Sequence, residues 1–279
     1  MNAARLSVPG RLRRTLAAGA AGLEWAQMRA FDAVLGVSTE KWMLTDESLF
    51  VSDTENTAYV GCQWLPLRRV LTDLPLQRSD VFVDIGAGKG KALLIAGRFR
   101  CAGVIGVELN AELSADAARN VEVARRRLRC QRVETVHANA LEWPIPSEAS
   151  VFFLNNPFIG NTFRSAIERV INSYDLFPRP VRIVYGHPWE HDWLLSTGRV
   201  VLENVRPRFW PTQPGWWRSE HVITVYRVVA AGTESADSKP AAVRTGRRKA
   251  MARWAAPNGQ AYALRPTGMD AVRSDRRGG

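Results

Sequence analysis

Several kinds of residue are scarce in this chain of 279 residues. Its three cysteines, at positions 62, 101 and 130, are too few and too scattered for a disulfide framework or a zinc cluster, which need paired or closely spaced thiols. No apolar run approaches the roughly 18–20 residues of a membrane-spanning helix. No group of carboxylates and histidines has metal-ligand spacing. We therefore expect a soluble, cytoplasmic protein with no membrane span and no metal.

Charge of one sign is also scarce in the middle of the chain. The formal net charge is +11, but residues 231–279 carry ten Lys/Arg against four Asp/Glu, a net of +6, and residues 1–30 carry five against one, a net of +4. Subtracting both from +11 leaves +1 for residues 31–230. Nucleic-acid binding is therefore not indicated for the core, and only weak contact by the basic tail stays open.

Short apolar runs are abundant from residue 80 onward, where they alternate with helical stretches. This alternation is typical of crossover units and predicts an α/β fold with a doubly wound, mostly parallel sheet. No helix separates the last two strands, so we expect them to form an antiparallel hairpin at one edge. The seven expected strands are residues 81–84, 103–108, 133–137, 151–154, 181–185, 200–205 and 221–228.

The composition divides the chain into three segments. Residues 1–75 are expected to form a helical arm, closed by Gly36 as a C-cap, and a preface that could fold over a cofactor. Residues 76–230 form the α/β domain. In residues 231–279 the apolar periodicity stops and Gly, Ser, Pro, Ala and Arg dominate, which predicts disorder.

A glycine-rich turn follows the first expected strand and reads Asp84-Ile-Gly86-Ala87-Gly88-Lys-Gly90. Glycines let the backbone approach a ligand, and the start of the next helix offers free N–H groups to a polar moiety. A dinucleotide fingerprint would need glycine where Lys91 stands. A P-loop would need glycine at Ile85 and Ser or Thr at Ala92. Both classes are excluded.

The spacing that remains, D-x-G-x-G-x-G, resembles the first motif of the class I, seven-stranded S-adenosylmethionine-dependent methyltransferases. This resemblance covers roughly residues 30–230 and implies a Rossmann-like methyltransferase fold with S-adenosylmethionine as cofactor. It implies that the cofactor is bound by Asp84, Gly86, Ala87, Gly88 and Gly90. In the preface, Tyr59, Gln63 and Trp64 are candidates for lining the open side of the cofactor.

Two further strand ends fit the same pattern. Glu108 lies about twenty residues beyond the glycines, which is the spacing of a carboxylate that accepts the ribose hydroxyls. Leu109 is expected at the same site. Asn139 stands where the family has a polar residue near the adenine, and Ala140 is expected to supply backbone contacts.

The fourth motif, Asn155-Asn156-Pro157-Phe158, ends another strand. It is similar to the N-P-P-Y/F motif of amine-directed methyltransferases, although Asn156 stands at the first proline position. A closer parallel is the N-N-F element of the telomeric-silencing type of histone-lysine methyltransferase. Bacterial relatives with an N-P-F ending look closer still, and no substrate can be carried over from them.

The expected mechanism is alignment of an acceptor with the methyl group, because methyl transfer is an in-line displacement. We expect Asn155, with Asn156 nearby, to accept a hydrogen from an incoming amine or hydroxyl, while Phe158 packs against the acceptor. His187 is a candidate general base for a hydroxyl substrate, and a simple turn histidine is the alternative interpretation.

Three functions stay open on the sequence alone. The leading hypothesis is a methyltransferase acting on an amine or hydroxyl of a small molecule or a protein. The first alternative is a protein-lysine methyltransferase. The second is a cofactor-binding module or partner subunit without catalysis, against which the intact Asp84, Gly86, Gly88, Gly90 and Glu108 argue.

Overall fold

The structure is a computed structural model that describes residues 29–39, 64–206 and 223–232, the single residues 26 and 62, and the pairs 254–255 and 261–262. The chain divides into two compact units, Met1–Ser238 and Lys239–Gly279. The second unit holds a short antiparallel ladder between β8 (Trp254–Ala255) and β9 (Ala261–Tyr262). Disorder in the rest of residues 231–279 stays a prediction.

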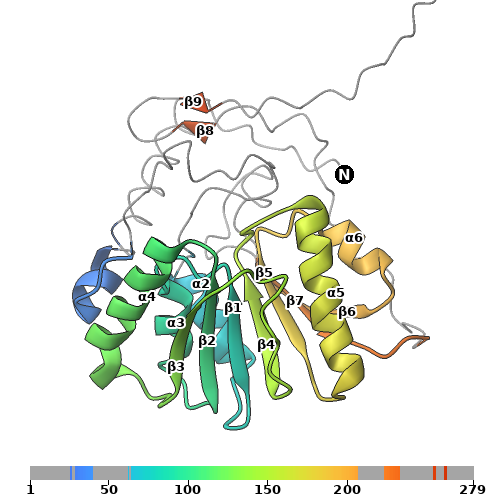
Figure 1. Ribbon diagram of the computed structural model, residues 1–279, viewed down its shortest axis with the longest axis horizontal. Helices are drawn as coiled ribbons and strands as arrows, with labels where there is room; N and C mark the ends of the chain where they lie inside the picture. The colour runs from blue at the N-terminus through green and yellow to red at the C-terminus, as the bar shows by residue number, and fades with distance from the viewer. Residues whose placement is uncertain are drawn as a thin grey trace, which may run out of the picture. The chain divides into compact units, whose positions relative to one another are not determined.

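The first unit is built on a seven-stranded sheet with the order β3-β2-β1-β4-β5-β7-β6 (Figure 1). Only β7 runs antiparallel to its neighbours, and it lies between β5 and β6, so β6 is the edge strand. The expected mostly parallel sheet with an antiparallel hairpin at its edge is therefore confirmed. The strands are β1 (Val81–Ile85), β2 (Gly103–Glu108), β3 (Val133–His137), β4 (Ala149–Leu154), β5 (Arg182–Gly186), β6 (Val200–Arg206) and β7 (Ile223–Val228).

Helices cover both faces of this sheet because the strands are apolar on both sides, as buried parallel strands are. One face packs against residues 29–35, α2 (Trp64–Asp73), α3 (Lys91–Ala96) and α4 (Ala111–Ala124). The other face packs against α5 (Gly160–Leu176) and α6 (His191–Ser196) (Figure 1). Phe82 and Val83 illustrate the alternation, since each is fully buried but in a different one of the two cores.

Local signals set where the helices begin and end. Asn110 caps α4, and its side chain accepts a hydrogen bond from the Leu113 N–H at 3.0 Å. The helix α4 ends at Ala124, and the chain continues as the 3₁₀ turn η2 (Arg125–Arg127). Gly36 has φ of +71°, as expected of a glycine that ends a helix.

None of the helices within the described ranges is long and apolar enough to cross a membrane.

Candidate active site

Four strand ends bring the predicted residues to one edge of the sheet. Strands β2, β1, β4 and β5 are consecutive neighbours and run parallel, so the loops after them share the carboxyl edge. The loops carry Glu108, the glycine turn 84–90, the turn 155–158, and His187. In open α/β sheets this edge is where ligands bind.

The glycine turn is tied to the end of β2 by its backbone. Gly86 and Ala87 both donate their N–H groups to the Val107 carbonyl, at 2.9 and 3.1 Å. Gly88 donates to the Glu108 carboxylate at 2.7 Å, and the Asn110 N–H donates to the other carboxylate oxygen at 2.9 Å. Each carboxylate oxygen keeps acceptor capacity for a further donor. Glu108 is therefore held in a fixed orientation beside the turn.

Asp84 is a carboxylate buried at the end of β1, with 3% of its surface exposed. Burial raises the pKa of the Asp84 carboxyl well above its usual range, and the nearby charge of Glu108 raises it further. A cation beside Asp84 would favour its ionised form. The methionine ammonium group of S-adenosylmethionine is such a cation, so this residue fits the predicted cofactor.

Two glycines make room for the turn 155–158. A Cβ atom at Gly86 would lie 2.3 Å from the Pro157 Cβ, and one at Gly186 would lie 2.5 Å from the Asn155 Oδ1. Gly86 also has φ of +79°, which side-chain-bearing residues rarely adopt. The side-chain amide of Asn155 therefore lies directly against the backbone at the end of β5, and Pro157 lies against the glycine turn.

Two other residues at this edge have unusual backbones. Asn156 and His187 have φ of +55° and +53°, and they are the only non-glycine residues with positive φ among those the structure describes. Such conformations cost free energy and cluster at functional sites. Asn156 is buried, and its Oδ1 accepts a hydrogen bond from the Tyr185 hydroxyl at 3.1 Å.

The remaining predicted residues are more dispersed. Phe158 is 7% exposed and belongs to the apolar core beneath α5, while Leu109 is 50% exposed at the end of β2. The Asn139 side chain stabilises its own turn, because it accepts from the Leu141 N–H at 3.0 Å and donates to Glu142 at 3.1 Å. Ala140 is half-buried beside it. Contact of these residues with cofactor or acceptor stays a prediction.

The N-terminal arm lies beside the glycine turn. The Asn120 side chain on α4 donates to the Ser38 and Lys89 carbonyls, at 3.1 and 3.0 Å, and accepts from the Ser38 N–H at 3.1 Å. Trp64 packs on Phe31 of the arm, with ring centroids 4.6 Å apart. Tyr59 and Gln63 lie outside the described residues.

Sequence reasoning missed the groups that hold the 155–158 turn in place. Tyr185 and Gly186 end β5, and their roles depend on β5 lying next to β4, where Leu154 pairs in register with Tyr185. Within the described ranges, no group of three or more histidines, cysteines or carboxylates is arranged to hold a metal ion.

A family model described as "Histone methylation protein DOT1" matches residues 52–176 of this chain. That segment contains the glycine turn, Glu108 and the 155–158 turn, and it supplies strands β1 to β4 of the seven-stranded sheet. The chain is an S-adenosylmethionine-dependent methyltransferase. No curated protein matches this methyltransferase significantly.

Solved structures similar to the methyltransferase share little sequence with it. The YcgJ protein of Bacillus subtilis has a TM-score of 0.46 and 12% identity, covering 60% of this chain and 99% of that one. An RNA methyltransferase of Salinibacter ruber, in complex with S-adenosyl-L-homocysteine, has a TM-score of 0.43 and 19% identity, and the match covers 64% of this chain and 98% of that one. A SAM-dependent methyltransferase of Aquifex aeolicus has a TM-score of 0.44 and 14% identity, and the match covers 60% of this chain and 91% of that one.

Proposed function

We propose that this methyltransferase transfers a methyl group to an amine nitrogen, with the site at the carboxyl edge of β1, β2, β4 and β5. Asp84 binds the ammonium group of the cofactor, and Glu108 accepts its ribose hydroxyls. The backbone of Gly86, Ala87, Gly88 and Gly90 approaches the amino-acid part, and Leu109, Asn139 and Ala140 line the adenine. The fixed Glu108 carboxylate and the buried Asp84 support these roles.

S-Adenosylmethionine supplies, when bound, an electrophilic methyl group on a sulfonium sulfur. The task left for the chain is to hold a neutral acceptor in line with that methyl group. Asn155 accepts a hydrogen bond from the acceptor N–H, which turns the nitrogen lone pair toward the methyl group. Asn156 holds the same turn, and Phe158 packs beneath it.

The placement of Asn155 is the observation that carries this proposal. Its amide lies against Gly186, where any larger residue would displace it, and the neighbouring Asn156 is fixed by the Tyr185 hydroxyl. An amide held by two adjacent strands loses little entropy when it binds an acceptor. This preorganisation favours orientation of an amine over acid–base chemistry.

For the acceptor we propose the side-chain amine of a protein lysine. The description of the matching family model names histone methylation. In addition, the motif Asn155–Phe158 is similar to the amide-containing motifs of amine-directed methyltransferases. A hydroxyl is the second candidate, because His187 has a strained backbone at the same edge and could remove a hydroxyl proton.

A reducing, cytoplasmic location agrees with this proposal. All three cysteines are free thiols, including Cys101 and Cys130, whose loops are adjacent. An oxidising compartment would favour disulfides.

The first test of the cofactor site is calorimetric titration with S-adenosylhomocysteine. We expect wild type to bind in the micromolar range, at about −8 kcal/mol. Asp84→Ala and Glu108→Ala should both lose binding while keeping the circular dichroism spectrum of wild type. Absence of binding to folded wild type would instead favour a non-catalytic role.

The acceptor is tested with radiolabelled S-adenosylmethionine and a mixture of lysine-rich proteins. Half of the mixture is first acetylated on its lysine amines, so that these nitrogens become amides and are no longer nucleophilic. We expect label only in the untreated half, and a rate about 100-fold lower for Asn155→Ala. Label in both halves, lost in His187→Ala, would instead support a hydroxyl acceptor.

A further inference from the structure

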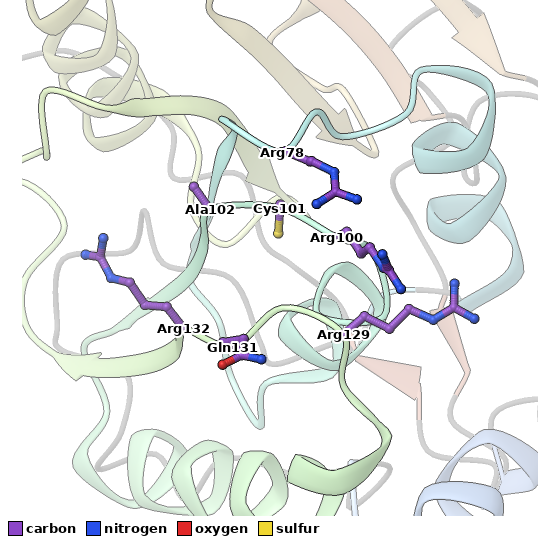
Figure 2. A pocket seen from close by; sticks show the side chains of 7 residues that line it. All are labelled: Arg78, Arg100, Cys101, Ala102, Arg129, Gln131 and Arg132. Carbon is purple, nitrogen blue, oxygen red and sulfur yellow. The ribbon is translucent and has the colours of Figure 1, made fainter.

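A pocket of about 500 Å³ lies at the opposite, amino edge of the sheet (Figure 2). It is formed by the turn before β1, the loop before β2 and the loop before β3. Four of its seven lining residues are arginines. The lining is Arg78, Arg100, Cys101, Ala102, Arg129, Gln131 and Arg132. Because β1 has five residues, this pocket is about 15 Å from the proposed methyl-transfer site.

Three of these arginines have no counter-charge within the described part of the chain. Arg78, Arg100 and Arg129 are exposed, and no ion pair or side-chain hydrogen bond joins them to any described residue. Figure 2 shows their guanidinium groups on one side of the pocket, with that of Arg132 turned the other way. Arginines from three separate loops therefore line one pocket.

The nearby carboxylates are engaged elsewhere. Asp80 accepts hydrogen bonds from the Gln77 N–H at 2.6 Å and from the Ser150 hydroxyl at 2.7 Å. Glu134 and Glu148 both pair with Arg132, at 3.1 and 3.3 Å. No carboxylate belongs to the lining of the pocket. The pocket is therefore an electropositive site even though the core of the chain is almost neutral.

The spacing of the arginines indicates a ligand with several negative charges. Their loops precede β1, β2 and β3, which are consecutive strands, and neighbouring strands lie about 4.8 Å apart. The three loops that carry the arginines are thus spread over roughly 10 Å. A guanidinium binds phosphate through paired hydrogen bonds, and a chain of phosphates matches such a row better than one phosphate does.

The basic surface also continues beyond the pocket. The N–H groups of Arg129 and Cys130 both donate to the Gly97 carbonyl, at 2.7 and 3.0 Å, which brings the Arg98 turn next to the pocket. In the η2 turn, which precedes the pocket in the sequence, Arg125 pairs with Glu122 and Arg127 donates to the Leu35 carbonyl, so only Arg126 is exposed with neither an ion pair nor a side-chain hydrogen bond among the described residues. The unpaired arginines of the pocket and of this turn are together more than the phosphate chain of a free nucleotide needs.

We propose that this pocket binds the phosphate backbone of a nucleic-acid strand, at the edge of the sheet opposite the methyl-transfer site. The proposal is independent of the acceptor. It assigns to the core a nucleic-acid contact separate from any made by the basic tail.

The test is fluorescence anisotropy with a short labelled single-stranded RNA and full-length protein. Arg100→Gln/Arg129→Gln is compared with Arg119→Gln/Arg227→Gln, which removes the same charge from exposed positions on α4 and β7. We expect the pocket variant to bind about tenfold or more weakly at low salt. Its plot of log affinity against log salt should be less steep by about 1.4, because two phosphate contacts are lost.

The control variant should bind nearly as tightly as wild type, with an unchanged salt slope. Arg78→Gln, in a turn outside the sheet, repeats the test independently of the other two loops. Equal weakening in both double variants, or no weakening in either, would overturn the proposal in favour of net charge or the tail. Tighter, arginine-dependent binding of ATP than of RNA would overturn it in favour of a free nucleotide.

Discussion

The carboxyl edge of the sheet holds the buried carboxylate of Asp84, the buried amide of Asn156 and tightly packed glycines, whereas the loops that precede β1, β2 and β3 carry exposed arginines. At the carboxyl edge, Gly86 fits against Pro157 and Gly186 against Asn155, with no room for one more carbon atom. At the amino edge, Arg78, Arg100 and Arg129 reach into open space.

This difference predicts two kinds of sensitivity to substitution. The carboxyl edge is a set of interlocking backbones, so a small change there should disturb both stability and cofactor binding. The amino edge is a set of independent side chains, so changes there should affect a charged ligand and leave the fold intact.

The largest effect is expected for Gly86→Ala. The new Cβ would lie 2.3 Å from the Pro157 Cβ on a backbone with φ of +79°, so both overlap and strain oppose it. We expect the free energy of unfolding to fall by about 2–4 kcal/mol and S-adenosylhomocysteine binding to be lost. Urea denaturation measures the first and calorimetry the second.

Gly198→Ala is the matched control for that substitution. Gly198 also has positive φ, +64°, but a Cβ there would meet no atom within 4 Å. Gly198→Ala should lower the free energy of unfolding by only about 1 kcal/mol and leave cofactor binding unchanged. Similar losses in the two variants would show that backbone conformation alone, and not contact with Pro157, sets the cost.

A large pH-dependent effect is expected for Asp84→Asn. The folded-state pKa of Asp84 is raised, so its contribution to stability is fully present below the unfolded pKa of about 3.9 and is lost as the pH rises through the folded pKa. Asp84→Asn should therefore be more stable than wild type at neutral pH and equally stable near pH 3. Urea denaturation at a series of pH values measures the difference.

A variant at the other edge provides the comparison for that pH profile. Arg100→Gln should differ from wild type by a constant amount, because a guanidinium keeps its charge throughout this range. A difference between Asp84→Asn and wild type that did not change with pH would contradict a raised pKa at Asp84.

A moderate effect is expected for Tyr185→Phe. The substitution removes the hydroxyl that donates to Asn156, so the unfolding free energy should fall by about 1 kcal/mol. Methyl transfer should slow severalfold, because the turn that carries Asn155 is less well held. Tyr226→Phe is the control: its hydroxyl lies 2.6 Å from the His191 Nδ1 instead, so it should lose stability with little change in rate.

The fold could be predicted from the sequence in some detail, and the packing of the site could not. Strands 103–108 and 133–137 were predicted with the observed bounds, because apolar runs with clear flanking turns define them. The contacts of Tyr185 and Gly186 with the 155–158 turn require knowing that β5 lies next to β4. Neighbour order in a sheet is a long-range property that local patterns do not contain.

The charge and cysteine counts say nothing, for the same physical reason, about which of these residues lie close together. A net charge of +1 over residues 31–230 averages arginines at one edge of the sheet with carboxylates elsewhere. Cys101 and Cys130 are distant in sequence, yet the Cys130 thiol donates to the Cys101 carbonyl at 3.3 Å, because β2 and β3 are neighbours. Counting by sequence position cannot detect groups that the sheet brings together.

The smallest effect is expected for Arg132→Gln, which removes the fourth arginine of the pocket. Its exposed pairs with Glu134 and Glu148 should contribute less than about 1 kcal/mol to stability. Since those carboxylates already hold its guanidinium group away from the other three, RNA affinity should change much less than in Arg129→Gln, as anisotropy at matched salt would measure. Equal losses of RNA affinity in Arg132→Gln and Arg129→Gln would mean that the amino edge binds RNA through its overall positive charge. Whether an arginine is paired with a carboxylate would then make no difference to binding.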